Sequence, residues 1–417
     1  MGKFAHYNLP HILMTPIHQR ARWVVPVFWL GAALALVGMA KFMPFAWDAK
    51  DYLLAVQQYP AYVHGQVNLS LAYSPLFMIP ALGAATLLPL WLAAALFVLT
   101  YFAGFLVQIW VVMQCATESE RKVLAYLAPA IVFFPGLLIS ESGVIASGNL
   151  AYILYGAMFA GAAWGWKRDR WNWFYLAVLV SACAKVQLLT MLAIPLLCGG
   201  RPWRRTLLTG SAGLAIYALQ ARIWPQLFHT YLHSLQAMSL SPRDFGYGPA
   251  GNLARIFQHH GAAYYWPCIV FYLAYAAVLF VILLSLSKLY REQKISFPSW
   301  APVMLLGVIL LNPRILAYDV AAVSLPMALI VWRSLMRGEA SVSKPKLIAC
   351  ALSVFIGINV FVESAENLGM VPDAAKYVEM FLMLGIFANG VWGLLREVGI
   401  EPVASPAYAI ESVSESD

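Results

Sequence analysis

The first long polar stretch of the chain carries residues that suit acid–base chemistry. It runs from Trp47 to Pro75, directly after a strongly apolar segment. Two carboxylates, Asp48 and Asp51, open this stretch, and the phenol of Tyr52 follows them. A carboxylate at a membrane boundary, with aromatic and polar groups around it, is suited to accept a proton from a substrate. We therefore predict Asp48 as a general base, the alternative being an N-terminal cap of a short surface helix.

A single lysine interrupts the apolar segment at residues 172–198. Lys185 is followed by Val186 and Gln187, and long apolar runs lie on both sides. A lysine so far from the ends of the run is costly to bury unless it meets an anion or water. We predict that Lys185 binds a lipid phosphate and that Gln187 lies beside the substrate. A structural ion pair is the alternative role for Lys185.

A third group of polar residues stands at a proline-broken junction. In the sequence from Asn312 to Asp319, the cation of Arg314 precedes the phenol of Tyr318 and the carboxylate of Asp319. A guanidinium suits a phosphate, and a carboxylate suits a hydroxyl group. We predict that this junction binds substrate; the alternative is a tight turn closed by an ion pair between Arg314 and Asp319.

The composition is that of an integral membrane protein. Of the 417 residues, 62% are hydrophobic and only 11% are charged, whereas soluble domains carry roughly 25% charged residues. The apolar runs are continuous, which favours helices over a β-barrel. The net charge of +8 comes from short basic clusters between these runs, as expected for contact with anionic lipid and not with nucleic acid. The five cysteines show no paired spacing and predict neither a disulfide framework nor a metal site.

The apolar runs predict an all-α, polytopic fold with about 12 transmembrane helices, since a span needs about 20 residues. The predicted spans fall at 23–43, 75–114 (a short helix and a longer one, broken at Pro89), 123–138, 148–165, 172–198, 205–224, 266–287, 299–312, 319–335, 346–362 and 377–395. Residues 172–198 either cross once or turn back at Lys185 as two short helices.

The same pattern predicts the organisation of the chain around the membrane. Residues 1–22 are predicted to be cytoplasmic, and 23–398 to form one transmembrane domain that begins with an uncleaved anchor. External loops are expected at about 44–74, with a short surface helix over 51–58, and at 225–265. The tail, 399–417, is polar and Ser-rich and is predicted to be disordered and cytoplasmic.

Several short motifs, weak singly but ordered along residues 23–335, resemble those of a known family. They are Asp48, Tyr52, Ala55 and Gly65 with Tyr73-Ser74-Pro75, then Gly148-Asn149, Lys185-Val186, Gly251-Asn252-Leu253 with Arg255, and Asn312-Pro313-Arg314 with Tyr318-Asp319. In this order they resemble the GT-C membrane glycosyltransferases of family GT87, the polyprenol-phosphate-mannose-dependent α-mannosyltransferases. The chain departs from that pattern at Leu53, Val56 and Ser74, and it lacks the family's His-His pair.

The resemblance implies a GT-C fold and the transfer of a hexose, most simply mannose. The donor would be a polyprenyl phosphate, and the acceptor a hydroxyl group of a glycolipid or glycan on the external face of the cytoplasmic (inner) membrane. Asp48 would be the base, Lys185 and Arg314 would hold the phosphate, and the sugar or acceptor would be oriented by Asp51, Tyr52, Gln187, Asn252, Tyr318 and Asp319.

The lipid-linked donor is a co-substrate, and no cofactor is predicted. The sequence has no Gly-rich nucleotide loop and no Asp-x-Asp motif, which disfavours a nucleotide-sugar donor with a bound metal ion. Two other classes remain open: a transporter or flippase of a lipid-linked or small substrate, and a non-catalytic scaffold. The absence of a visible internal repeat speaks against a transporter.

Overall fold

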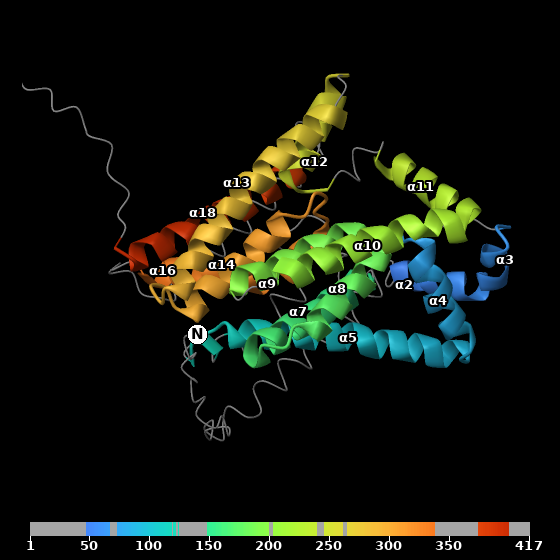
Figure 1. Ribbon diagram of the computed structural model, residues 1–417, viewed down its shortest axis with the longest axis horizontal. Helices are drawn as coiled ribbons and strands as arrows, with labels where there is room; N and C mark the ends of the chain where they lie inside the picture. The colour runs from blue at the N-terminus through green and yellow to red at the C-terminus, as the bar shows by residue number, and fades with distance from the viewer. Residues whose placement is uncertain are drawn as a thin grey trace, which may run out of the picture.

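The computed structural model describes residues 47–66, 73–118, 120–121, 124, 148–199, 203–239, 246–261, 265–337 and 374–399. These residues form helices joined by turns, without a strand among them. Figure 1 shows an elongated bundle with α2, α3 and α4 near one end and α16 and α18 near the other. The predicted spans at 23–43 and 346–362, most of the span at 123–138, and residues 1–22 and 400–417 lie outside the described part of the chain.

Most predicted spans within the described residues coincide with helices. These are α4 (Pro75–Thr86), α5 (Leu90–Gln114), α7 (Ala151–Arg168), α10 (Trp203–Ile223), α13 (Tyr265–Arg291), α14 (Phe297–Leu310) and α18 (Ala374–Glu397). Of the described helices, three are long and apolar enough to cross a membrane: Leu90–Gln114, Trp266–Arg291 and Tyr377–Glu397. The chain is thus an all-α membrane protein, and the total of twelve spans stays a prediction.

The regions predicted as external loops contain helices of their own. The first holds α2 (Trp47–Gln57), where a surface helix was predicted, and α3 (Tyr59–Val63). The second holds α11 (Pro225–Ser239) and α12 (Pro249–His259). In Figure 1, α2, α3 and α11 lie toward the same end of the molecule, whereas α12 lies beside α13.

The predicted span at 319–335 is not one helix. It is divided into α15 (Ala317–Ala322) and α16 (Ser324–Arg337) by a turn at Val323. Pro326, near the start of α16, has no amide hydrogen to donate to a carbonyl of the preceding turn, so an uninterrupted helix through this point loses a hydrogen bond.

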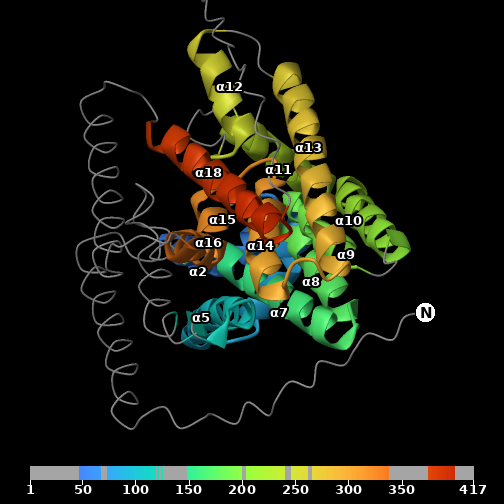
Figure 2. The ribbon, with the colours of Figure 1, turned by 90° about the vertical axis from the view of Figure 1, so that its left-hand side faces the viewer.

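Helix α14 forms the centre of the bundle. Its residues are apolar on every side, and all of them from Trp300 to Leu310 are buried. A helix that is hydrophobic all round belongs inside a protein or membrane, where every face has an apolar neighbour. Helices α13, α16 and α18 pack against it, and Figure 2 shows it among them near the middle of the end-on view.

The segment at 172–198 turns back on itself at Lys185. It consists of α8 (Asn172–Ala184), a 3-10 helix η3 (Val186–Leu192) and α9 (Ala193–Cys198), with Lys185 in extended backbone between the halves. A Cβ on Gly213 of α10 would touch Leu189 of η3 and come within 3.7 Å of Leu179 of α8. Both halves therefore lie beside the same helix, and of the two predicted alternatives the structure has the turn.

The two ends of this hairpin lie together. The hydroxyl of Tyr175, near the start of α8, lies 3.2 Å from that of Thr206, near the start of α10. The basic residues that flank the hairpin, at 167–170 and 204–205, are consequently at the same end of the bundle. Lys185, at the tip of the hairpin, is at the other end.

Helices α5 and α7 cross at very short distance. A Cβ on Gly104 would lie 2.7 Å from the backbone oxygen of Tyr152, and a Cβ on Gly156 would lie 2.7 Å from the Cα of Gly104. Small residues allow such backbone contact between helices in membranes. This contact fixes the start of α7 relative to α5.

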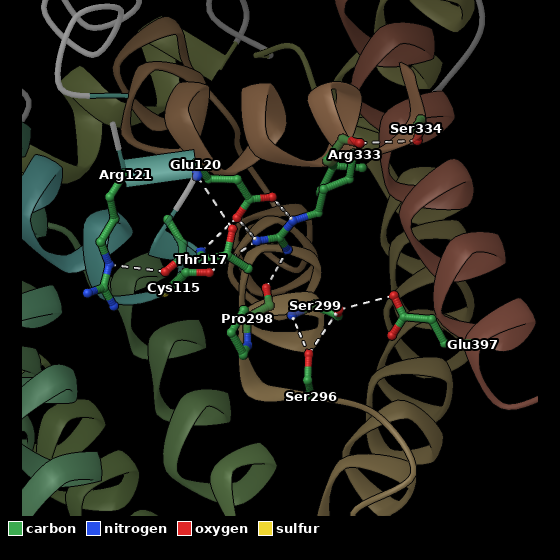
Figure 3. Close-up of polar contacts among 12 residues, drawn as sticks. Cys115, Thr117, Glu120, Arg121, Ser296, Pro298, Ser299, Arg333, Ser334 and Glu397 are labelled. Atoms are coloured by element: carbon green, nitrogen blue, oxygen red, sulfur yellow. Dashed lines mark hydrogen bonds and ion pairs between the residues drawn. The ribbon is translucent and has the colours of Figure 1, made fainter. Parts of the chain in front are cut away.

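A polar joint, made of Glu120 and Arg333 with their backbone partners, ties several helices together at the basic end (Figure 3). The guanidinium of Arg333 in α16 donates to both carboxylate oxygens of Glu120, in each case at 2.7 Å. It also donates to the backbone oxygens of Pro298, in α14, and Cys115, at the end of α5. Ser299 of α14 further donates to Glu397 of α18 at 3.1 Å.

Candidate functional site

Six predicted site residues meet at the end of the bundle opposite the polar joint. They come from α2, from the hairpin tip and from the junction after α14, and they are Asp48, Tyr52, Lys185, Arg314, Tyr318 and Asp319. Lys185 interacts electrostatically with Asp319, Arg314 and Asp48. Tyr318 interacts in the same way with Tyr52 and Asp48. The fold thus brings together side chains that are more than a hundred residues apart in sequence.

Lys185 is a buried cation that no anion among the described residues contacts directly. The residue is only 7% exposed, because apolar helical segments flank it on both sides. Its ammonium nitrogen lies 3.8 Å from the centre of the Tyr318 ring and 5.2 Å from that of the Tyr73 ring. With the described residues it makes these ring contacts and neither a hydrogen bond nor an ion pair. The faces of aromatic rings attract cations, but they leave the three N–H donors available.

Asp319 has its two carboxylate oxygens bonded to other groups. It is 1% exposed, Oδ1 accepts a hydrogen bond from the hydroxyl of Tyr155 at 2.5 Å, and Oδ2 accepts one from the backbone N–H of Leu316 at 2.7 Å. Its interactions with Lys185 and Arg314 are longer-range. The alternative prediction, a turn closed by a direct ion pair with Arg314, therefore does not hold. The carboxylate instead anchors the start of α15 and faces both cations.

Arg314 is half-buried in the turn between α14 and α15. Its backbone N–H donates to Oδ1 of Asn312 at 3.1 Å, and the next residue, Ile315, accepts from the backbone N–H of Tyr247 at 2.6 Å. Gly246 also lies so close that a Cβ there would come 2.4 Å from the oxygen of Ile315. The segment that begins at Gly246 therefore supports the turn that carries Arg314.

Asn252 belongs to this support and not to the residues around Lys185. It is 2% exposed; its Nδ2 donates to the oxygens of Tyr247 and Gly248, and its Oδ1 accepts from Arg255. Arg255 in turn donates to the oxygen of Gly246 at 3.0 Å. We predicted Asn252 as a substrate ligand; the structure directs its side chain to the turn at 246–248.

Asp48 begins α2 and is half-buried. Its Oδ2 accepts a hydrogen bond from Nδ2 of Asn149 at 2.9 Å. The neighbouring phenols of Tyr52 and Tyr73 share a hydrogen bond of 2.8 Å. Burial, and then the charge of Asp48, raise the pKa of Tyr52 above its ordinary value. Tyr52 consequently stays a neutral hydroxyl beside the carboxylate at physiological pH.

Two predicted residues are not joined to this group by hydrogen bonds. Asp51 is exposed on α2, and its negative charge contributes, as the smallest of the causes, to the raised pKa of Tyr52. Gln187 is half-buried at the start of η3, and its side chain makes no hydrogen bond within the described part of the chain.

Three further residues of the site were not predicted individually. They are Tyr73, which lies under Lys185, Asn149, which contacts Asp48, and Tyr155, which contacts Asp319. Tyr73 and Asn149 stand in motifs that carry the family resemblance, so a signal for them was present. Tyr155 lies within an apolar helix, where nothing in the sequence separates it from an ordinary buried aromatic residue.

The histidines of α11 are not grouped with other metal-ligating side chains among the described residues. His229 and His233 are exposed on α11, and no three His, Cys, Asp or Glu residues gather in the described ranges.

Comparison with known proteins adds no relative: no family model, curated protein or solved structure matches the chain. The similarity to family GT87 therefore remains a prediction from the spaced residues named above. What the arrangement can do chemically follows from its own groups. The half-buried carboxylate of Asp48 and the guanidinium of Arg314 both interact electrostatically with Lys185, and the ring of Tyr318 lies against the Lys185 ammonium group.

Proposed function

We propose that this protein is a membrane glycosyltransferase that transfers a hexose, most simply mannose, from a polyprenyl phosphate to an acceptor hydroxyl. The observation that carries the proposal is the grouping of Asp48 with Lys185 and Arg314 at one end of the bundle. Transfer from a lipid phosphate requires a base for the acceptor and positive charge for the leaving phosphate. The site offers both.

The chemistry proposed is a single displacement with inversion. The acceptor oxygen attacks the anomeric carbon while its proton passes to the carboxylate of Asp48, the general base. The bond between the anomeric carbon and the phosphate oxygen breaks, and its electron pair leaves with the polyprenyl phosphate. A phosphate leaves as a stable anion, so the reaction needs no general acid.

The two cations are suited to hold the leaving phosphate. Lys185 has no hydrogen-bond partner among the described residues, and a phosphate oxygen would accept from its N–H groups. Cations placed before the reaction, in a site screened from water, stabilise charge that develops in the transition state. Tyr318, whose ring lies beside Lys185, is placed to contact the sugar.

The opposite end of the bundle supports an external position for the site. Four cations there lie over exposed tryptophan rings: Lys167 over Trp110, Arg168 over Trp164, Arg204 over Trp203 and Arg396 over Trp392. Tryptophan prefers the level of the lipid headgroups, and basic residues prefer the cytoplasmic side. If this end is cytoplasmic, Asp48 and Lys185 are on the external side of the inner membrane.

The test is transfer by the purified full-length protein in vesicles supplied with radiolabelled polyprenyl-phosphate mannose and a mixed glycolipid acceptor fraction. We expect a labelled glycosidic product, and a loss of at least about 10²-fold in Asp48→Asn, the typical contribution of a general base. The control is Asp169→Asn, in an exposed turn with positive φ that asparagine tolerates.

Three results would contradict this proposal. Label that crosses the bilayer without forming a product would indicate the alternative function, a flippase. Full transfer by well-folded Asp48→Asn would exclude Asp48 as the base. Absence of both transfer and transport would exclude this donor class.

A further inference from the structure

A side chain outside the predicted set contacts the proposed base. Asn149 lies just before α7, and its Nδ2 donates to Oδ2 of Asp48 at 2.9 Å. Its Oδ1 accepts the backbone N–H of Ala151, also at 2.9 Å. A backbone N–H can only donate, so the amide oxygen must face the helix and the NH₂ group must face the carboxylate. The first turn of α7 therefore fixes the direction of the amide.

The turn that carries Asn149 is held tightly against α2. Gly148 has φ +70°, and a Cβ there would lie 2.9 Å from the Cβ of Ala49. The backbone N–H of Leu150 donates to the hydroxyl of Tyr52 at 3.4 Å. The hydroxyl of Tyr73 also points at Oδ1 of Asn149, at the longer distance of 3.5 Å. Asn149 is thus fixed from both sides, by α2 and by α7.

We infer that Asn149 is a positioning residue for Asp48, holding the carboxylate in its ionised form and in the orientation that the acceptor hydroxyl requires. The inference rests on the proposed function for the role of Asp48 as the base, but the contact itself does not depend on it. A hydrogen bond from an N–H group favours the charged form of a carboxylate. A shift of about 1 Å in a reacting group can slow a reaction by about 10²-fold.

The surroundings of Asp48 make a new charge at position 149 a strong perturbation. Within the described part of the chain, the titratable groups that interact electrostatically with Asp48 include Lys185, Tyr52, Tyr73, Tyr101 and Tyr318. On its own helix, Asp51 and Lys50 are exposed. None of these places a second carboxylate against Asp48. Asn149→Asp would do so within hydrogen-bond distance, where two carboxylates do not both ionise readily.

The first measurement is the pH dependence of transfer by purified full-length variants in vesicles. In Asn149→Asp we expect the acid limb of the profile to move up by about one pH unit or more. In Asn149→Ala we expect kcat to fall by about 10-fold to 10²-fold with the donor KM unchanged, because the donor phosphate is held by Lys185 and Arg314. The control, Asn172→Asp, makes the same chemical change at an exposed site at the far end of the bundle.

The second measurement does not use transfer. Carbodiimides modify protonated carboxyl groups, so the modification of Asp48 is followed against pH by peptide mass spectrometry. We expect its midpoint to lie at higher pH in Asn149→Asp than in the wild type or Asn172→Asp. Unchanged midpoints would overturn the inference whether or not the protein transfers sugar. A shifted midpoint in a protein without transfer would keep the contact and reject the proposed function. A normal profile and normal kcat in both Asn149 variants would exclude the positioning role.

Discussion

Two buried cations, Arg333 and Lys185, lie at opposite ends of the bundle and differ in the groups that contact them. Arg333, in the polar joint, has a side chain 13% exposed and donates to both oxygens of Glu120, whose side chain is 9% exposed. Lys185 is similarly buried, at 7%, yet its described neighbours are tyrosine rings and not a contacting anion. The charge of Arg333 is neutralised by Glu120, whereas no described anion contacts the charge of Lys185.

This difference separates a structural role from a functional one. Moving a charge out of water is unfavourable unless a partner and further hydrogen bonds compensate it. At the polar joint the compensation is complete within the protein, and four helical segments depend on it. At the hairpin tip it is only partial, which is expected where an anionic ligand supplies the remainder. The four predictions that follow test these two roles and the contacts around them.

The largest loss of stability is expected from Arg333→Met. This change leaves Glu120 buried without its partner, and breaking one side of a buried pair costs about 3–5 kcal/mol. Reversible unfolding of the purified protein in mixed micelles would measure it. The control is Lys288→Met. The side chain of Lys288 is 73% exposed, and its Nζ lies 3.9 Å from Oε1 of Glu292, so the substitution should change stability by less than about 1 kcal/mol. Wild-type stability in Arg333→Met would contradict the structural role.

The change Lys185→Met should reduce transfer without reducing stability, in contrast to Arg333→Met. Transfer should fall by about 10²-fold to 10³-fold, as for the loss of one electrostatic donor in an active site. The free energy of unfolding should not fall, because the substitution removes a buried charge that no anion in the described part of the chain contacts. Activity and unfolding are measured on the same preparations. A loss of stability equal to that of Arg333→Met would mean that Lys185 is structural.

A smaller effect is expected from Gly148→Ala. The positive φ of Gly148 and its contact with Ala49 predict a loss of about 1–3 kcal/mol in stability, with lower transfer because α2 and Asp48 shift. Gly385→Ala is the matched control, since a Cβ there has nothing within 4 Å and alanine favours a helix by about 0.5–1 kcal/mol. Equal effects of the two substitutions would show that the turn at 148 does not hold α2 in place.

The smallest effect concerns the pH dependence of the polar joint. Burial opposes ionisation of Glu120, but hydrogen bonds from Arg333 and Thr117 outweigh it and lower its pKa below the ordinary value of 4.5. A carboxylate with a lowered pKa stabilises the fold fully above pH 4.5, and this contribution is lost as the pH falls further. Unfolding measured from neutral pH to below 4.5 should show the loss in the wild type. The double variant Glu120→Gln, Arg333→Met should lack this component.

Much of the helical layout could be predicted from the sequence, because apolar runs and proline positions act locally. The break at Pro89 was expected on these grounds, and the spans predicted at 148–165 and 299–312 correspond to α7 and α14. The turn at Lys185 was one of two predicted alternatives, since an unpaired lysine within an apolar run allows both. The division at Val323 was missed because the run from 320 to 332 is almost entirely apolar, and hydropathy does not register a missing amide hydrogen.

In the candidate site, charged residues beside apolar runs gave the main sequence signal, which identified Asp48, Lys185, Arg314 and Asp319. The phenols of Tyr52 and Tyr318 were predicted from their places next to these charges. Asn252 has the same polar character, but it bonds Tyr247, Gly248 and Arg255. These partners lie within five residues of it, and polarity alone does not separate such a local structural role from contact with a substrate.

By itself, the sequence determined that this is a helical membrane protein with a few isolated charges in its apolar runs, because burial preferences are properties of each segment. The tertiary structure alone decided which charges meet. The hairpin at Lys185, the close crossing of α5 and α7 and the support of the turn at 313–316 are contacts between distant segments. These contacts bring Lys185 near the carboxylates of Asp48 and Asp319 without a direct ion pair. At the other end, a separate long-range contact pairs Arg333 with Glu120.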